Sequence, residues 1–279
     1  MWFRKKAKEN MQAKWGAVAA FAVMVGMNMA AVLLPLNGIS TAEVSDKNLN
    51  LFAPAGITFS IWSVIYTLLL VYTVMQFGTV RKKFGLKIRE EFFDKVTPLY
   101  IASSLLNAVW IVCWHYEVLW LTVILMIALL VTLIKIAAIT TDYVKNHALS
   151  WKEYVAIRLP FTVYFGWITI ATIANITTWL VSIGFKGGPL KPGVWMVLLV
   201  FIGLTIAVLA AAKNRDPAYV GVFIWAYIGI LLKHLSDQGF KGMYPSVIIA
   251  VTICITLLMT VFIMMTAGSR LIAKEHNND

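Results

Sequence analysis

Residues 159–184 read LPFTVYFGWITIATIANITTWLVSIG and contain no charged side chain. The run has the length of a helix that crosses the hydrocarbon core of a bilayer, for which roughly 20 apolar residues suffice. Backbone N–H and C=O groups cannot stay unpaired in lipid, so an apolar run of this length must be helical there. We therefore predict a transmembrane helix over residues 159–184.

Further apolar blocks of similar length lie on both sides of this run. The eight predicted spans are 16–36, 57–79, 98–116, 118–140, 159–184, 193–212, 217–235 and 245–267. The composition agrees, because 60% of the 279 residues are hydrophobic and 13% are charged, against about 45–50% and 25% in soluble domains. A β-barrel would show short alternating segments instead. The predicted fold class is an all-α polytopic membrane protein.

The net charge of +11 would suggest a nucleic-acid partner in a soluble protein. Here the charged residues lie between the apolar blocks, so membrane topology explains them and we expect no nucleic acid. If the N-terminus is cytoplasmic, all but five of the 24 Lys and Arg residues fall on the cytoplasmic side, as the positive-inside rule requires. The exceptions are Lys47, Lys186, Lys191, Lys233 and Lys241. We therefore predict a basic cytoplasmic N-terminus over 1–15 and a cytoplasmic tail over 268–279.

Two connecting segments carry expectations of their own. The longest external segment, 37–56, is polar and is either a lid or a plain connector. The cytoplasmic stretch 81–95 is dense in charge and is expected to lie along anionic headgroups.

The sequence shows no sign of catalytic chemistry. Every acidic residue falls in a loop, a tail or a span end, whereas ion-coupled transporters place an ionisable group at membrane depth. Phosphate-binding, dinucleotide-binding, zinc-helix and nucleophile-elbow motifs are missing. We predict no enzyme, no catalytic residue and no metal site. His115 and Glu117, at a predicted hairpin tip, are interpreted as span-end residues rather than as an axial ligand or proton pair.

Tryptophan is the residue type that stands out, with eleven copies. Six of them lie in the outer half of a predicted span, and an aromatic belt at the outer interface would explain any single one of the six. These are Trp62, Trp110, Trp114, Trp120, Trp179 and Trp195. Trp167 and Trp225 lie nearer the bilayer middle, where an indole N–H needs a partner. Asn107 and Asn175 share that depth and either bridge helices or anchor a ligand in an intramembrane pocket.

Trp167, Ala171, Asn175 and Trp179 follow one another at steps of four residues. This spacing places them along one stripe of the helix predicted over 159–184. A small residue between bulky ones allows a close approach by another helix or by a planar ligand. Packing and ligand binding both remain open on this pattern.

These residues resemble those of the tryptophan-rich sensory protein family, also called the translocator or TspO/MBR family. Leu106-Asn107-x-x-Trp110 is similar to the third-helix motif of that family, and the stripe in 159–184 is similar to its fifth-helix signature. The likeness in the second helix consists of Pro54-x-Gly56-x-x-Phe59 followed by Trp62 and Tyr66. The chain departs from the pattern at Ala55, where the family has a second proline. Three predicted spans after residue 184 have no counterpart in the five-helix members, so the chain resembles a longer, divergent bacterial branch.

The resemblance implies a five-helix bundle over 16–184, extended by three transmembrane helices over 185–267, in the cytoplasmic (inner) membrane of a bacterium. It also implies a pocket under the first external segment that takes a tetrapyrrole, such as protoporphyrin or haem, or a sterol-like lipid. That molecule would be a ligand, and no cofactor is required. The residues expected to line the ligand site are Phe59, Trp62, Tyr66, Asn107, Trp110, Trp167, Ala171, Asn175 and Trp179.

The leading functional hypothesis is a non-enzymatic membrane binding or sensory protein, whose partners are the lipid bilayer and a hydrophobic small molecule. A facilitative transporter of a small hydrophobic molecule is the first alternative, because eight spans allow it. A structural or partner protein is the second, because Gly221-x-x-x-Trp225-x-x-x-Gly229 offers small residues for helix packing. The sequence also leaves a homodimer open.

Overall fold

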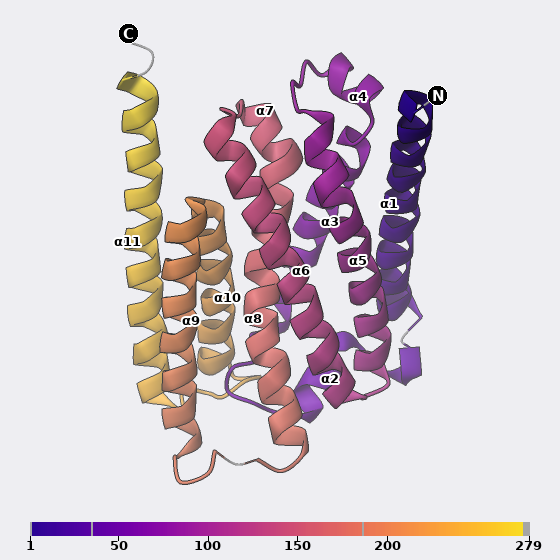
Figure 1. Cartoon of the computed structure of the whole chain (residues 1–279). Coiled ribbons are helices and arrows are strands. Elements are labelled where there is room, and N and C mark those ends of the chain that lie inside the picture. The colour runs from indigo at the N-terminus through magenta and orange to yellow at the C-terminus, as the bar shows by residue number, and fades with distance from the viewer. Residues whose placement is uncertain (1, 35, 186, 276–279) are drawn as a thin grey trace. The chain divides into compact units, whose positions relative to one another are not determined.

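The computed structural model describes residues 2–34, 36–185 and 187–275, and the side chains within them except at 2–9, 42 and 268–275. The last four residues of the predicted cytoplasmic tail and the basic side chains near both ends therefore lie outside the described part. Helices joined by turns make up the described chain (Figure 1). The elements are α1 (Trp2–Leu33), η1 (Leu36–Gly38), α2 (Thr41–Lys47), η2 (Gly56–Ser60), α3 (Ile61–Met75), α4 (Gly78–Lys83), α5 (Glu90–His115), α6 (Leu119–Asn146), α7 (Trp151–Glu153), η3 (Tyr154–Arg158), α8 (Leu159–Ser182), α9 (Pro192–Asn214), α10 (Pro217–Leu235) and α11 (Pro245–Glu275).

The predicted all-α membrane fold is confirmed. Within the described residues, 8 helical stretches are long and apolar enough to span a membrane. They cover 10–33, 56–75, 90–115, 119–146, 151–182, 192–214, 217–235 and 245–267. The fifth begins earlier than predicted, because α7, the π-helical turn η3 and α8 follow one another without a break. The third also begins earlier, since Pro98 lies inside α5 instead of starting it.

Several helix ends follow from local sequence. Ser150 caps α7 through its side chain, and Glu153 reaches back to the Ser150 N–H, which completes a capping box. Asp216 caps α10 by accepting a hydrogen bond from the Ala218 N–H at 3.1 Å, and Pro217 occupies the first helical position. Between α5 and α6, Glu117 adopts a left-handed conformation with φ 55°, which closes the tight hairpin predicted from the sequence.

The chain divides into two compact units, described separately below. Unit 1 comprises residues 1–47 and 61–168, and unit 2 comprises residues 48–60 and 169–279. The division passes through α8, so the first part of that helix belongs to unit 1 and the rest to unit 2. The family resemblance predicts a different division, in which a five-helix unit over 16–184 is followed by three further helices over 185–267. That division stays a prediction.

In unit 1, α5 packs against both α1 and α6, and α3 contacts α1 and η3 (Figure 1). Aromatic side chains fill the space between α3, α5 and the start of α8. The Tyr72 ring lies 5.0 Å from that of Tyr100 and 4.6 Å from that of Phe161, in edge-to-face arrangements. This is a favoured geometry for aromatic pairs, and all three residues are at most 1% exposed.

In unit 2, helices α9, α10 and α11 pack together, and α10 also contacts η2. Tyr227 of α10 donates a hydrogen bond to the Val200 carbonyl of α9 at 2.6 Å. The approach depends on Gly203, because a Cβ there would collide with the Tyr227 hydroxyl. Cys254 of α11 is a free cysteine and is fully buried.

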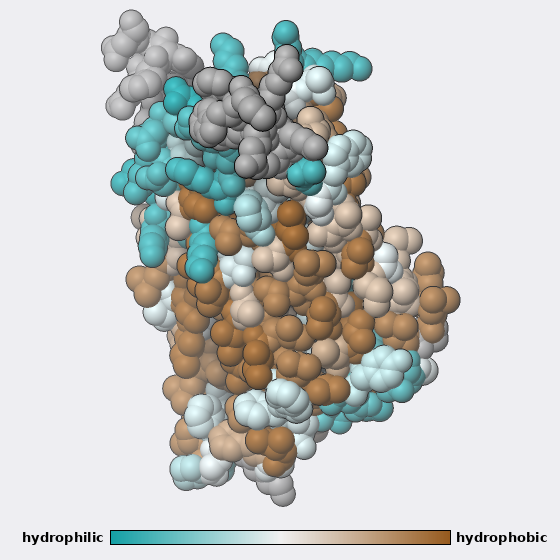
Figure 2. All heavy atoms as spheres, turned by 45° about the vertical axis from the view of Figure 1, so that its right-hand side comes forward, coloured by the Kyte–Doolittle hydropathy of each residue, from teal (hydrophilic) through white to brown (hydrophobic). Residues whose placement is uncertain are grey.

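The surface carries the pattern expected of a membrane protein. On the face drawn in Figure 2, hydrophobic side chains form a broad belt and hydrophilic side chains gather beyond it. Large apolar residues account for many of the exposed positions on the spans, among them Val64, Leu70 and Ile124. Lipid tails satisfy such side chains, so their exposure needs no protein partner.

Candidate functional site

An aromatic cluster occupies unit 1 where α3 meets the first part of α8. Trp62 stacks on Tyr66 one turn further along α3, with ring centroids 5.5 Å apart and planes 21° from parallel. The Trp62 ring also meets Tyr164 at 6.0 Å and Trp167 at 6.1 Å, both edge-on. The structure thus brings together three predicted ligand residues, Trp62, Tyr66 and Trp167, into one group of flat side chains.

Asn107 of α5 is joined to this cluster by hydrogen bonds. Its amide nitrogen donates to the Tyr164 hydroxyl at 3.1 Å, and its amide oxygen accepts from Asn28 of α1 at 2.8 Å. Asn107 is fully buried. Of the two roles left open for the deep asparagines, Asn107 has the bridging one in this structure, and its chain of bonds links α1, α5 and α8.

Trp110, one turn after Asn107, forms a second aromatic pair. Its ring stacks on Trp114 with centroids 5.5 Å apart and an interplanar angle of 26°. The Trp114 indole donates to the Thr41 carbonyl of α2 at 3.1 Å. The buried Nε1 of Trp110 has no hydrogen-bond partner among the described residues, and the same holds for the buried hydroxyl of Tyr66. Each of the two stacked pairs in unit 1 therefore includes one buried polar group without a partner among the described residues.

The first half of the external segment folds onto α5 in unit 1. Ser40 and Glu43 bond reciprocally across the first turn of α2, and the bonds from Ser40 hold the pKa of the Glu43 carboxyl below its usual range. His115, fully buried at the end of α5, hydrogen-bonds to the Leu36 carbonyl at 3.2 Å and to the Thr41 hydroxyl at 2.9 Å. This segment is therefore an ordered cover over Trp114 and His115.

Residues 48–60, which are the second half of the external segment together with η2, belong to unit 2 and are bound to α8 and α10. Asn50 donates to the Thr178 hydroxyl at 3.1 Å, and His234 hydrogen-bonds to the Leu51 carbonyl at 2.9 Å. The Trp225 indole donates to the Thr58 carbonyl at 3.0 Å. Trp225 thus has the partner that its depth led us to expect. The small residues of its stripe have different neighbours, because Gly229 faces Thr58 of the turn and Gly221 faces Phe262 of α11.

The remaining predicted ligand residues lie in unit 2. Phe59 is half-buried in η2, and Ala171 and Trp179 are half-buried on α8. Asn175, between them on α8, is 3% exposed, and neither its amide nitrogen nor its amide oxygen has a hydrogen-bond partner among the described residues. A buried primary amide with no partner costs free energy, so this position is suited to a polar group from outside the chain.

Sequence reasoning missed two residues of the unit 1 cluster. Tyr164 contacts Trp62 and Asn107, and its position three residues before Trp167 puts it on the same helix face, which is a readable signal. Asn28 is a lone amide within an apolar span, so its need for a partner was also readable.

The hairpin tip has a structural role in the described chain. One ring nitrogen of His115 bonds to the Leu36 carbonyl of η1 and the other to the Thr41 hydroxyl of α2, and Glu117 pairs with Lys47 at 2.6 Å. Among the described residues, no group of three or more His, Cys, Asp or Glu side chains could hold a metal ion.

Comparison with known proteins identifies one relationship. A family model described as TSPO-like protein matches residues 14–265, which is most of the chain and includes the helices after residue 184. No curated protein and no solved structure matches the chain in the corresponding comparisons.

Proposed function

This chain belongs to the TSPO-like protein family, and we propose that it is a non-enzymatic binding or sensory protein of the membrane. Its ligand is hydrophobic and planar, and the aromatic side chains of unit 1 stack against it. The tetrapyrrole class, such as protoporphyrin or haem, fits this description, and a sterol-like lipid is the runner-up. A tetrapyrrole would be bound as a ligand and not as a required cofactor.

The observation that carries this proposal is the combination, in unit 1, of flat rings with buried polar groups that have no hydrogen-bond partner in the described part of the chain. Trp62, Tyr66, Trp110 and Trp114 offer two stacked pairs. The Trp110 indole can only donate a hydrogen bond, so it favours a ligand with an oxygen acceptor at its edge. Ligand sites in proteins combine such apolar surfaces with a few polar groups that fix orientation.

The first experiment titrates protoporphyrin IX and haem into the protein purified in mild detergent. Tryptophan quenching and the absorption band of the ligand report binding, with empty micelles as the blank. We expect saturable binding, which the double variant Trp62→Leu/Trp110→Leu weakens about tenfold, because it removes one indole from each stacked pair of unit 1. Trp120→Leu is the matched control, since Trp120 is 56% exposed at a span end.

A gentler variant tests the polar part of the proposal. Tyr66→Phe removes a buried hydroxyl that has no partner among the described residues, so it should leave the unfolding temperature unchanged or raise it. If the hydroxyl contacts a polar edge of the ligand, affinity falls while the fold stays intact. Unchanged affinity in both this variant and the tryptophan double variant would argue against the site.

The orientation in the membrane is part of the same proposal. The charge distribution supports both termini in the cytoplasm, and the resemblance to the longer bacterial branch supports the cytoplasmic membrane of a bacterium. The external segment 37–56 would then face the periplasm. Its first half contacts α5 within unit 1, and its second half contacts α8 and α10 within unit 2.

A further inference from the structure

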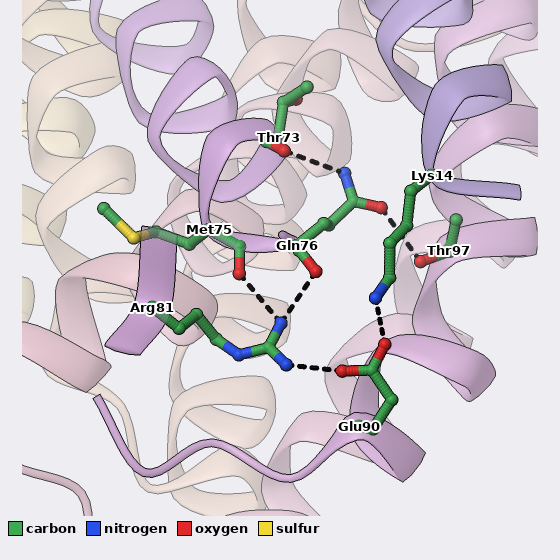
Figure 3. A network of polar contacts seen from close by, with 7 residues as sticks. All are labelled: Lys14, Thr73, Met75, Gln76, Arg81, Glu90 and Thr97. Atoms are coloured by element: carbon green, nitrogen blue, oxygen red, sulfur yellow. Dashed lines mark hydrogen bonds and ion pairs between the residues drawn. The ribbon is translucent and has the colours of Figure 1, made fainter. Parts of the chain in front are cut away.

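A partly buried ionic cluster holds the short helix α4 onto unit 1. Arg81 is 6% exposed, and its Nη1 donates to the carbonyls of Met75 and Gln76 at 3.0 and 2.7 Å (Figure 3). Met75 is the last residue of α3, and Gln76 follows it. Its Nη2 and the ammonium of Lys14 both pair with the carboxylate of Glu90. The guanidinium also stacks on Phe93, 4.3 Å from the ring centroid.

Arg81 is buried in the unit, whereas the neighbouring cations of α4 and of the following loop are exposed. Lys82, Lys83, Lys87 and Arg89 are exposed, and so is the Phe84 ring among them, at 53%. We call these five residues the basic platform. Two carboxylates at this end of the unit are engaged, since Glu90 pairs with Arg81 and Lys14, and Glu153 accepts from the Lys87 N–H. The other acidic side chains described there, Glu91, Asp94 and Asp142, are balanced in number by three exposed lysines. These lysines are Lys95, Lys145 and Lys152.

The backbone of the platform is hydrogen-bonded to side chains of α6 and α7. The Lys87 N–H donates to the Glu153 carboxylate at 2.7 Å, and the Arg89 N–H donates to the Tyr143 hydroxyl at 3.1 Å. Glu153 is itself held by the capping box with Ser150. These hydrogen bonds fix the backbone that carries the charged side chains of the platform.

Exposed aromatic residues lie at the same level of unit 1. Trp15 of α1, 61% exposed, meets Phe77 immediately before α4 at 5.3 Å. Trp151, 71% exposed, begins α7 two residues before the carboxylate that holds Lys87. Exposed tryptophans on both sides of the platform indicate the headgroup level of a bilayer, which puts its cations where lipid phosphates lie.

We propose that the basic platform binds the headgroups of anionic phospholipids, with Phe84 inserted among the acyl chains. Lys82, Lys83, Lys87 and Arg89 supply the charge complement to the phosphodiesters. A zwitterionic phospholipid carries no net charge and gains little there. The platform acts independently of the proposed ligand site, so either proposal can fail without the other.

Native mass spectrometry of the delipidated protein in detergent tests this, with phosphatidylglycerol and phosphatidylcholine of equal chain length as probes. We expect the protein to prefer phosphatidylglycerol. Lys82→Gln/Lys83→Gln should reduce that preference about fivefold for each charge removed, which corresponds to about 1 kcal/mol for each basic residue near a membrane surface. Lys191→Gln/Lys241→Gln makes the same charge change at exposed positions of unit 2 and should leave the preference unchanged.

Two further measurements separate the two parts of the platform. Raising the salt from 0.1 to 1 M shortens the screening length from about 10 to about 3 Å, so the preference for phosphatidylglycerol should shrink. Phe84→Ser should weaken the binding of both lipids at either salt concentration. Equal binding of the two lipids by the unaltered protein would overturn the proposal, and so would an equal loss in the control variant.

Discussion

Because Gly229 has no Cβ, the turn at Gly56–Ser60 can pack closely against α10. A Cβ at residue 229 would collide with the Thr58 hydroxyl and lie 2.8 and 2.9 Å from the Cγ2 and Cβ atoms of Thr58. The Gly229 carbonyl also accepts from the Ala55 N–H at 3.0 Å, so the turn has little room to retreat. We expect Gly229→Ala to destabilise the protein by about 1–3 kcal/mol, the usual cost of overpacking, measured by unfolding in detergent.

Gly221→Ala on the same helix is the control for that prediction. A Cβ at residue 221 would lie 3.6 Å from the nearest atom, on Phe262, which is ordinary contact. Alanine favours a helix over glycine by up to about 1 kcal/mol, so this variant should be as stable as the parent or more stable. If the two alanine variants unfold alike, the turn does not rest on Gly229.

The sequence predicts which single residues need a partner, but not which partner they find. Depth in the membrane is enough to expect hydrogen bonds from Asn107 and Trp225, and both are made. Their partners, Tyr164 and Thr58, are distant in the chain, and only the packing of helices brings them near. Asn175 shows the reverse case, since it has the depth of Asn107 but no partner among the described residues.

Among the elements, the segment 48–60 depends on a few bonds from Asn50. Asn50 donates to the Thr178 hydroxyl, and its side-chain oxygen accepts from the Phe52 N–H at 3.1 Å. Asn50→Ala removes both bonds, so the amides of residues 50–53 should exchange with deuterium faster, by hydrogen-exchange mass spectrometry. Leu49→Ala, which alters an exposed neighbour, should leave that exchange unchanged. Equal exchange in the two variants would mean that the segment is held without Asn50.

Long apolar spans were predictable as elements, and the short elements between them were not predicted. Each span is specified by its own hydrophobic run, so the prediction needs no tertiary information. Helix α2 lies in the segment left as a lid or connector, although Ser40 and Glu43 carry a readable capping box. Its position depends on Trp114 and His115 of α5, which no local pattern reveals. The π-helical turn η3 likewise had no sequence signal that we recognised.

For the molecule as a whole, family membership and membrane fold follow from the sequence, whereas the grouping of the predicted ligand residues needs coordinates. Within unit 1, Trp62, Tyr66 and Trp167 form one aromatic cluster. Phe59, Ala171, Asn175 and Trp179 belong to unit 2. The four-residue spacing predicts that Trp167, Ala171, Asn175 and Trp179 share one face of α8. It does not predict which element each of them packs against.

The topology of the whole chain makes a prediction that depends on charge alone. With both termini in the cytoplasm, residue 49 is periplasmic and residue 148 is cytoplasmic, and both positions are exposed. In a background with Cys113→Ser and Cys254→Ala, Leu49→Cys should react with a membrane-impermeant maleimide in spheroplasts. Ala148→Cys should react only after the membrane is opened, because the lysine- and arginine-rich segments stay on the inner side. Labelling of Ala148→Cys before lysis, with Leu49→Cys protected, would reverse the orientation and move the basic platform to the outer leaflet.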